Sequence, residues 1–183
     1  MVLQLMEQKD DPNNTWKLGI GNLNPQWTYA RERGEGFRDK AEELGYEIAS
    51  EIVVANPSAE GGFDTMQQII SAAPDIAGAF FCSGREAVGA ANAVQAAGKD
   101  IYVVGYNGDP EELQAIVDGV LTGTILQQPY VIGYHSVEIL KEILEEGAEY
   151  EQEIVPAPVK LITPDNLEEI AKELEERRGQ PAY

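Results

Sequence analysis

Apolar and polar positions alternate between two periods along the chain, and this alternation predicts a regular succession of strands and helices. Strand-like runs occur at 16–22, 46–55, 76–82, 101–107 and 122–127. Segments whose apolar residues recur three and four positions apart, the spacing of an amphipathic helix, separate these runs at 28–45, 63–73, 85–98, 109–119 and 129–147. An extended stretch at 153–163 and a terminal helix at 163–178 complete the pattern.

Capping residues indicate where several of the predicted helices begin. Asp109 and Pro110 are the residue types favoured at the N-cap and at the first helical position. Thr28 is the predicted N-cap of the first long helix, and either Thr163 or Asp165 is the predicted N-cap of the terminal helix. These signals support the helix assignments made from periodicity.

Strands that alternate with helices of this length predict a three-layer α/β domain, in which helices cover both faces of a mostly parallel sheet. The chain has 183 residues, a length that suits one domain with a substantial core. In such sheets, ligands bind outside the carboxyl ends of the strands. The residues directly after each predicted strand are therefore the candidates for a binding site.

The predicted strand ends and the helix that follows the first strand carry side chains suited to neutral polyhydroxylated ligands. Amide and hydroxyl groups both donate and accept hydrogen bonds, arginine offers a rigid fork of donors, and aromatic rings offer flat apolar faces. A sugar needs this mixture, because its hydroxyls bind polar groups and its C–H faces pack on aromatic rings. The amide and hydroxyl residues are Asn22, Asn24, Ser83, Asn107, Gln127 and Gln128, the aromatic residues are Trp27, Tyr29 and Tyr106, and the arginines are Arg31 and Arg33.

Each of these residue types also has a structural explanation. Asparagine after a strand is common in turns, and Trp27 suits a partly buried core position equally well. Arg31 and Arg33 differ, because positive charge at the start of a helix is unfavourable against the helix dipole. A purely structural explanation is therefore less satisfactory for the two arginines than for the asparagines.

Charge narrows the range of partners. Asp and Glu number 32 against 13 Lys and Arg, which gives a formal net charge of -19 at pH 7. Such a surface repels nucleic acid and anionic membranes, so we expect neither as a partner. The start of the chain lacks the long apolar core of a secretory signal, and no apolar run approaches the roughly 20 residues of a membrane-spanning helix, so we expect no membrane insertion.

Catalysis finds little support in the sequence. The single histidine, His135, lies within an amphipathic helix, and the single cysteine, Cys82, follows a buried strand, as expected of an inert thiol. His, Cys and carboxylate residues show no zinc-ligand spacing, and "GIGNLN" does not complete a dinucleotide-binding or phosphate-binding motif. We therefore predict no enzyme activity, no metal and no cofactor.

Four longer motifs carry a resemblance to a known family. They are "YARERGEGFRDKAEELG", "MQQIISAAPDIAGAFFC", "REAVGAANAVQAAGKDIYVVGYNG" and "DGVLTGTILQQPYVIGYHSVEILKEILEEG". In order and spacing they resemble the C-terminal portion of ribose-type periplasmic sugar-binding proteins, a region shared with the effector domains of the lactose-repressor family. The resemblance implies one Rossmann-like (flavodoxin-like) lobe of a type I periplasmic binding protein over residues 16–163, followed by a C-terminal helix and tail at 164–183.

The resemblance also implies that part of the family's architecture is missing. The family has two lobes joined by three crossing strands, and this chain resembles the second lobe alone. Residues 1–15 would then be the remnant of an upstream helix and linker, and the chain a fragment without the N-terminal lobe. In the family, the helix that matches 129–147 packs on that first lobe. We expect it here either to pack back on its own sheet or to exchange into a second copy and form a homodimer.

The resemblance implies roles for the candidate residues. Arg33 matches the family arginine that forks onto ligand hydroxyls, and Arg31, one helix edge away, is the weaker candidate. Gln127 matches a glutamine near the hinge. Asn107 stands where ribose binders usually carry an aspartate, and Ser83 stands where the family commonly has an asparagine. The loop before Arg33, a region that lines the cleft in the family, adds Trp27 and Asn24.

The function implied by the resemblance is the non-catalytic binding of a sugar or polyol. The parent would be a substrate-binding protein of a sugar ABC transporter, periplasmic or extracellular, with a membrane permease as its partner. Asn107 and Ser83 depart from the family pattern, which leaves room for a different polyol or a modified sugar. An effector-binding lobe of a LacI-type transcriptional regulator stays open as the alternative, and a response-regulator-like domain or an unrecognised enzyme fits the strand ends less well.

Overall fold

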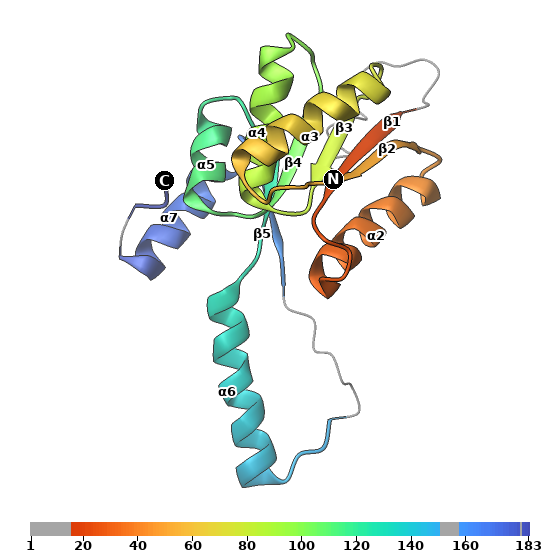
Figure 1. Cartoon of the computed structure of the whole chain (residues 1–183). Helices are drawn as coiled ribbons and strands as arrows, with labels where there is room; N and C mark the ends of the chain where they lie inside the picture. The colour runs from red at the N-terminus through yellow and green to blue at the C-terminus, as the bar shows by residue number, and fades with distance from the viewer. Residues whose placement is uncertain (1–15, 151–157, 180) are drawn as a thin grey trace.

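The computed structural model describes residues 16–150, 158–179 and 181–183, which build one six-stranded sheet with the order β2-β1-β3-β4-β5-β6 (Figure 1). Strands β1 to β5 pair in parallel, and β6 runs antiparallel to β5 at the edge. This sheet confirms the predicted α/β class, whereas the expected remnant at 1–15 lies outside the described residues. The strands are β1 (Lys17–Asn22), β2 (Glu47–Val53), β3 (Gly78–Phe81), β4 (Tyr102–Asn107), β5 (Gly123–Leu126) and β6 (Lys160–Ile162).

Helices connect the strands in the predicted order, with small differences at their starts. Asp109 is the N-cap of α5 and Pro110 is its first residue, as predicted. The N-cap of α2 is Trp27 rather than Thr28, because the Trp27 carbonyl already accepts the first helical hydrogen bonds. Helix α3 starts earlier than predicted, because the Ser58 hydroxyl caps it. The helices are α2 (Thr28–Glu43), α3 (Ala59–Ala72), α4 (Gly84–Ala96), α5 (Pro110–Val117), α6 (Pro129–Glu146) and α7 (Leu167–Arg178).

The terminal helix α7, in contrast to α3, begins later than predicted. Its N-cap is Asn166, and neither Thr163 nor Asp165 takes that place. The Asn166 side chain closes the preceding turn, since its Oδ1 accepts from the Thr163 N–H at 2.9 Å and its Nδ2 donates to the Leu161 carbonyl at 2.9 Å. This turn leads the chain directly from β6 into α7.

Buried side chains form a larger and a smaller cluster. The neighbours Val103 and Val104 on β4 belong to different clusters, whereas Phe80 and Phe81 on β3 both belong to the larger one, which therefore reaches both faces of the sheet. Helices α3, α4, α5 and α7 contribute Ile69, Ala90, Leu113 and Leu174 to the larger cluster. Helix α2 contributes Ala41 to the smaller cluster, which also contains Trp16, Leu18 and Tyr46.

Helix α6 is the exception, because it extends away from the sheet (Figure 1). It has 18 residues, and none of them is buried. The expectation that this helix packs back on its own sheet is therefore wrong. The chain leaves β5 at the carboxyl edge and continues away from the sheet, so the side chains of α6 do not pack on the strands (Figure 1).

Candidate functional site

Arg33, in the second turn of α2, reaches across the carboxyl ends of two strands. Its Nη1 donates a hydrogen bond to the carbonyl oxygen of Cys82, the residue after β3, at 3.0 Å. Its Cζ lies 3.6 Å from the centre of the Tyr106 ring on β4 and 5.0 Å from that of Tyr29. The two rings and the carbonyl fix the plane of the guanidinium group. Among the described contacts, only one hydrogen bond uses the fork, so its other donors remain available to a ligand.

Asn107 and Gln127 meet at the same edge. Asn107 ends β4 and Gln127 follows β5, and the Gln127 side-chain amide donates to the Asn107 Oδ1 at 3.2 Å. The Asn107 Nδ2 donates to Asp109 Oδ2 at 3.2 Å. The structure thus brings three of the sequence candidates, Arg33, Asn107 and Gln127, to adjacent strand ends. We call these three residues together with Tyr106 the rim cluster.

The aromatic residues before and within α2 extend the rim cluster. Trp27 and Tyr29 stack with ring centres 6.0 Å apart, and Tyr29 in turn lies beside Arg33. Trp27 has 42% of its surface exposed, so the alternative that it is a core residue is wrong. Asn24 is a turn residue, since its Oδ1 accepts from the Gln26 N–H at 2.9 Å and its carbonyl accepts from the Trp27 N–H at 2.9 Å.

Arg31 and Ser83 differ in how close they come to the rim cluster. Arg31 is exposed, and its Nε lies 3.8 Å from Glu35 Oε1 in a pair along α2. The structure does not bring Arg31 onto the Tyr106 ring. Ser83 is half-buried directly after Cys82, and its hydroxyl makes no capping hydrogen bond to α4. The Ser83 hydroxyl, just after β3, is therefore not used to cap helix α4.

Glu112 is a buried group of this region that the sequence analysis missed. Its Oε2 accepts from the backbone N–H groups of Gly108 at 2.9 Å and Asp109 at 3.0 Å, and its Oε1 accepts from the Thr124 hydroxyl at 2.5 Å. Desolvation outweighs these hydrogen bonds and raises the pKa of Glu112 to about 7. The signal was present in the sequence, because Asp109 and Glu112 have the spacing of a capping box.

The single cysteine and the single histidine of the chain lie in different environments. Cys82 is buried, and desolvation raises the pKa of its thiol, which accepts a hydrogen bond from the Leu23 N–H at 3.2 Å. His135 is exposed on α6 and lies 2.6 Å from Glu138. Within residues 16–150, 158–179 and 181–183, no three His, Cys, Asp or Glu residues are grouped to hold a metal ion. In the same ranges, no helix has the length and apolar character needed to cross a membrane.

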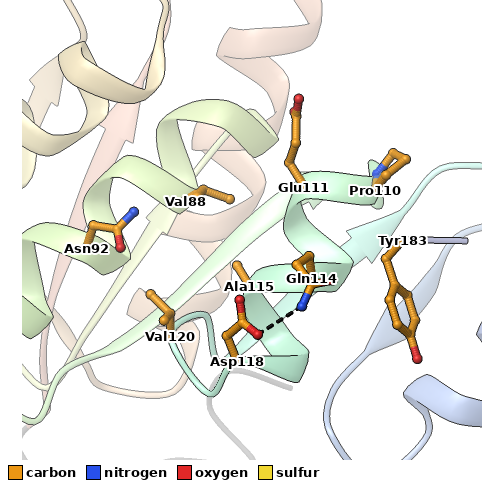
Figure 2. Close-up of a pocket in the computed structure, with 9 residues that line it drawn as sticks. All are labelled: Val88, Asn92, Pro110, Glu111, Gln114, Ala115, Asp118, Val120 and Tyr183. Atoms are coloured by element: carbon orange, nitrogen blue, oxygen red, sulfur yellow. Dashed lines mark hydrogen bonds between the residues drawn. The ribbon is translucent and has the colours of Figure 1, made fainter.

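A hollow of about 430 Å³, lined by none of the residues of the rim cluster, lies along α5 (Figure 2). It lies between α4, α5 and the C-terminal residue, and Gln114 donates to Asp118 at 2.8 Å on its wall. Most of its lining residues belong to α4 and α5, and none of them ends a strand. Its lining residues are Val88, Asn92, Pro110, Glu111, Gln114, Ala115, Asp118, Val120 and Tyr183.

The chain is similar in sequence to curated proteins and similar in fold to solved structures. Ribose import binding proteins of Salmonella typhimurium and Bacillus subtilis are 36% and 32% identical to the chain over 134 and 139 residues. These matches cover 73% and 76% of the chain but 44% of each relative, so the chain spans about half the length of the curated relatives it matches. The matched relatives are binding proteins and not enzymes.

Solved structures share the fold over most of the chain. A structure described as a periplasmic ribose ABC transporter from Conexibacter woesei has a TM-score of 0.84 at 21% identity, covering 97% of this chain and 59% of that chain. A Caulobacter myo-inositol binding protein, solved with myo-inositol, has a TM-score of 0.73 at 23% identity, covering 92% and 57%. The family described as the periplasmic binding protein domain matches residues 1–149. From this match and the shared fold, we conclude that the chain belongs to the periplasmic binding protein domain family.

Proposed function

We propose that the chain is a non-catalytic carbohydrate-binding lobe of a periplasmic substrate-binding protein that serves a sugar ABC transporter. The observation that carries the proposal is the guanidinium of Arg33 held on the Tyr106 ring, beside the amides of Asn107 and Gln127. Ligands of open parallel sheets bind at this edge. The ribose import binding proteins, which are 36% and 32% identical to the chain, support a sugar or polyol as the ligand.

The rim cluster offers the contacts that a sugar ring needs. Arg33 presents donors in a plane, and the amides of Asn107 and Gln127 add both donors and acceptors for hydroxyl groups. Trp27 and Tyr29 supply exposed aromatic faces for the C–H side of a sugar. We propose these five residues and the hydroxyl of Ser83 as the ligand-binding set, with Asn24 shaping the loop, and we leave Arg31 out of it.

We propose that the parent protein binds its ligand between this lobe and an N-terminal lobe, and that the closed form docks on a membrane permease. Closure of two lobes around a ligand is a known route to tight binding. A single lobe supplies about half of the contacts, so we expect roughly millimolar affinity from this chain alone.

The exposed face of α6 also needs a partner. We propose that the first lobe covers this face in the parent protein, and that in the isolated chain a second copy covers it in a homodimer. Leu144 and Val137 have 80% and 66% of their surface exposed. The other exposed large apolar side chains of α6 are Tyr130, Ile132, Tyr134, Leu140 and Ile143.

The test is a titration of the ¹⁵N-labelled chain with D-ribose, myo-inositol or D-allose, followed by NMR. We expect the backbone amides of Tyr106, Asn107 and Gln127 to shift in saturable fashion with at least one of them. Arg33→Lys should weaken binding by about tenfold, because lysine lacks the planar fork and the ring stack. Arg31→Lys on the same helix is the matched control and should bind as the wild type does.

Two results would overturn the proposal. One is that no carbohydrate shifts the rim amides at saturating concentration while another class of small molecule does so. The other is that Arg33→Lys and Arg31→Lys bind equally well, which would remove the guanidinium from the site. Shifts confined to the hollow near Tyr183 would count against the rim cluster in the same way.

A further inference from the structure

The carboxylate of Glu112 lies against two glycines from other segments, Gly84 and Gly105. A Cβ atom at Gly84 would lie 2.3 Å from Glu112 Oε2, and a Cβ atom at Gly105 would lie 2.4 Å from Glu112 Oε1. Both positions therefore require glycine while the carboxylate is in place. Glu112 itself has 1% of its surface exposed. The start of α4, strand β4 and strand β5 thus converge on this one side chain, directly behind the carboxyl edge of the sheet.

The loop that Glu112 holds has an unusual backbone. Asn107 has a φ angle of 137°, and among the described residues it is the only one other than glycine with a positive φ. Gly108 follows with a φ of 73°. Such conformations are unfavourable for a residue with a side chain and persist where the surroundings impose them. Here the N–H groups of Gly108 and Asp109 both donate to the Oε2 of Glu112, immediately after the strained residue.

We propose that Glu112 is a positioning residue of the sugar site, which clamps the loop 107–109 so that the Asn107 amide stays at the rim against Gln127. Glu112 acts through the backbone and does not touch the ligand. The assignment of a ligand to the rim rests on the proposed function, whereas the clamp itself can be tested without any sugar.

The protonation state of Glu112 should change the strength of the clamp. A carboxylate accepts stronger hydrogen bonds than a neutral carboxyl group. Burial raises the pKa of Glu112 to about 7, so its charge changes near neutral pH. The charged group that faces it is Asp109 at the start of α5, whereas β4, β5 and the start of α4 contribute Gly105, the Thr124 hydroxyl and Gly84. We therefore expect the loop to be held more tightly above pH 7 than below it.

The experiment compares the wild-type chain with Glu112→Gln, Glu112→Ala and Glu111→Gln by ¹⁵N NMR between pH 5.5 and 8.5. In the wild type, the Gly108 and Asp109 amide signals should move with a midpoint near pH 7, and in Glu112→Gln this movement should vanish. Glutamine keeps a carbonyl acceptor in the same place, so Glu112→Gln should retain the fold and the loop. Glu111→Gln, which alters the exposed neighbour on the same helix, should titrate as the wild type does.

The second readout is binding of D-ribose as the probe. Wild-type affinity should rise about threefold from pH 6 to pH 8, and the affinity of Glu112→Gln should stay constant. Glu112→Ala should bind about tenfold more weakly, because the loop amides lose their acceptor.

The two readouts separate the clamp from the sugar site. Unchanged amide titration in Glu112→Gln would overturn the clamp, and so would a folded Glu112→Ala variant that binds D-ribose with wild-type affinity. A normal amide titration in a chain that binds no sugar would support the clamp and count against the proposed function alone.

Discussion

Helices α2 and α6 occupy comparable places in the chain, but α2 packs on the sheet and α6 does not. Each follows a parallel strand at the carboxyl edge, and they have 16 and 18 residues. Helix α2 buries Ala30, Gly34 and Ala41, whereas α6 buries no residue, although α6 is the richer of the two in large apolar side chains. For these two helices, burial therefore does not follow the hydrophobicity of the helix, because the helix richer in large apolar side chains is the exposed one.

The same contrast holds between the rim, whose side chains have partners inside the lobe, and α6, whose apolar side chains are exposed. In the rim cluster, Arg33 and Asn107 have defined partners within the lobe, and so does Glu112 behind it. Along α6, the large apolar side chains are exposed, although the Arg177 guanidinium of α7 lies beside Tyr130, with its Cζ 5.8 Å from the ring centre. The rim should therefore be sensitive to single substitutions in the isolated chain, and α6 should not.

The largest expected effect comes from the proton on Glu112. The pKa of this group is raised from an ordinary value of 4.5 to about 7 in the fold. The unfolded chain thus loses the proton near pH 4.5 while the folded chain keeps it until about pH 7. Stability from the protonated group is fully present below pH 4.5 and is lost as the pH rises to 7. The free energy of unfolding should fall by about 3 kcal/mol over this window.

Urea unfolding at several pH values measures this loss, and Glu112→Gln provides the reference. The difference in free energy of unfolding between the wild type and Glu112→Gln should change steadily between pH 4.5 and 7 and then level off. Parallel pH profiles for the two proteins would show that Glu112 keeps its ordinary pKa in the fold.

A pair of glycine substitutions compares the effect on stability of a new methyl group in the packed helix α2 and in the exposed helix α6. In Gly34→Ala, the new Cβ would lie 2.4 Å from the Nδ2 of the buried Asn22, so α2 or Asn22 must shift. We expect a loss of about 2 kcal/mol. In Gly133→Ala, the new methyl group meets no atom within 4 Å, and better helix propensity should add about 0.5 kcal/mol. Urea unfolding and far-UV circular dichroism measure both, and equal effects would remove the contrast between the helices.

The smallest expected effect on stability comes from Leu144→Glu, at the most exposed large apolar side chain of α6. The free energy of unfolding of the monomer should change by less than about 0.5 kcal/mol. Self-association should weaken strongly, because a charge would enter the proposed homodimer interface. Light scattering over a wide range of protein concentrations measures this, with Glu145→Gln as the control. A wild-type chain that stays monomeric at every concentration would contradict the homodimer.

Much of the rim was accessible from the sequence because parallel strands end at a common edge. Asn107 and Gln127 are the last residues of predicted strands, and the pairing of β4 with β5 brings them within hydrogen-bonding distance. The stack of Arg33 on Tyr106 was not predictable from spacing, because it depends on the angle at which α2 crosses the strand ends.

Glu112 and α6 show why other features were missed. In "DPEEL", Glu112 reads as one more surface acid, and its burial depends on glycines at 84 and 105, which lie on other segments. For α6, the apolar face was evident in the sequence, but a periodicity reports only that a face is apolar. It does not report which surface, in this chain or another, will cover it.

The antiparallel pairing of β5 with β6 has a consequence for engineering. Leu126 and Lys160 are partners in this ladder, so the chain departs from the sheet and rejoins it at neighbouring positions. Everything between them is, in topological terms, the loop of one long hairpin. A short Asn-Gly turn placed after Gln127 should close the same ladder, giving a smaller lobe that keeps the rim and dispenses with its protruding arm.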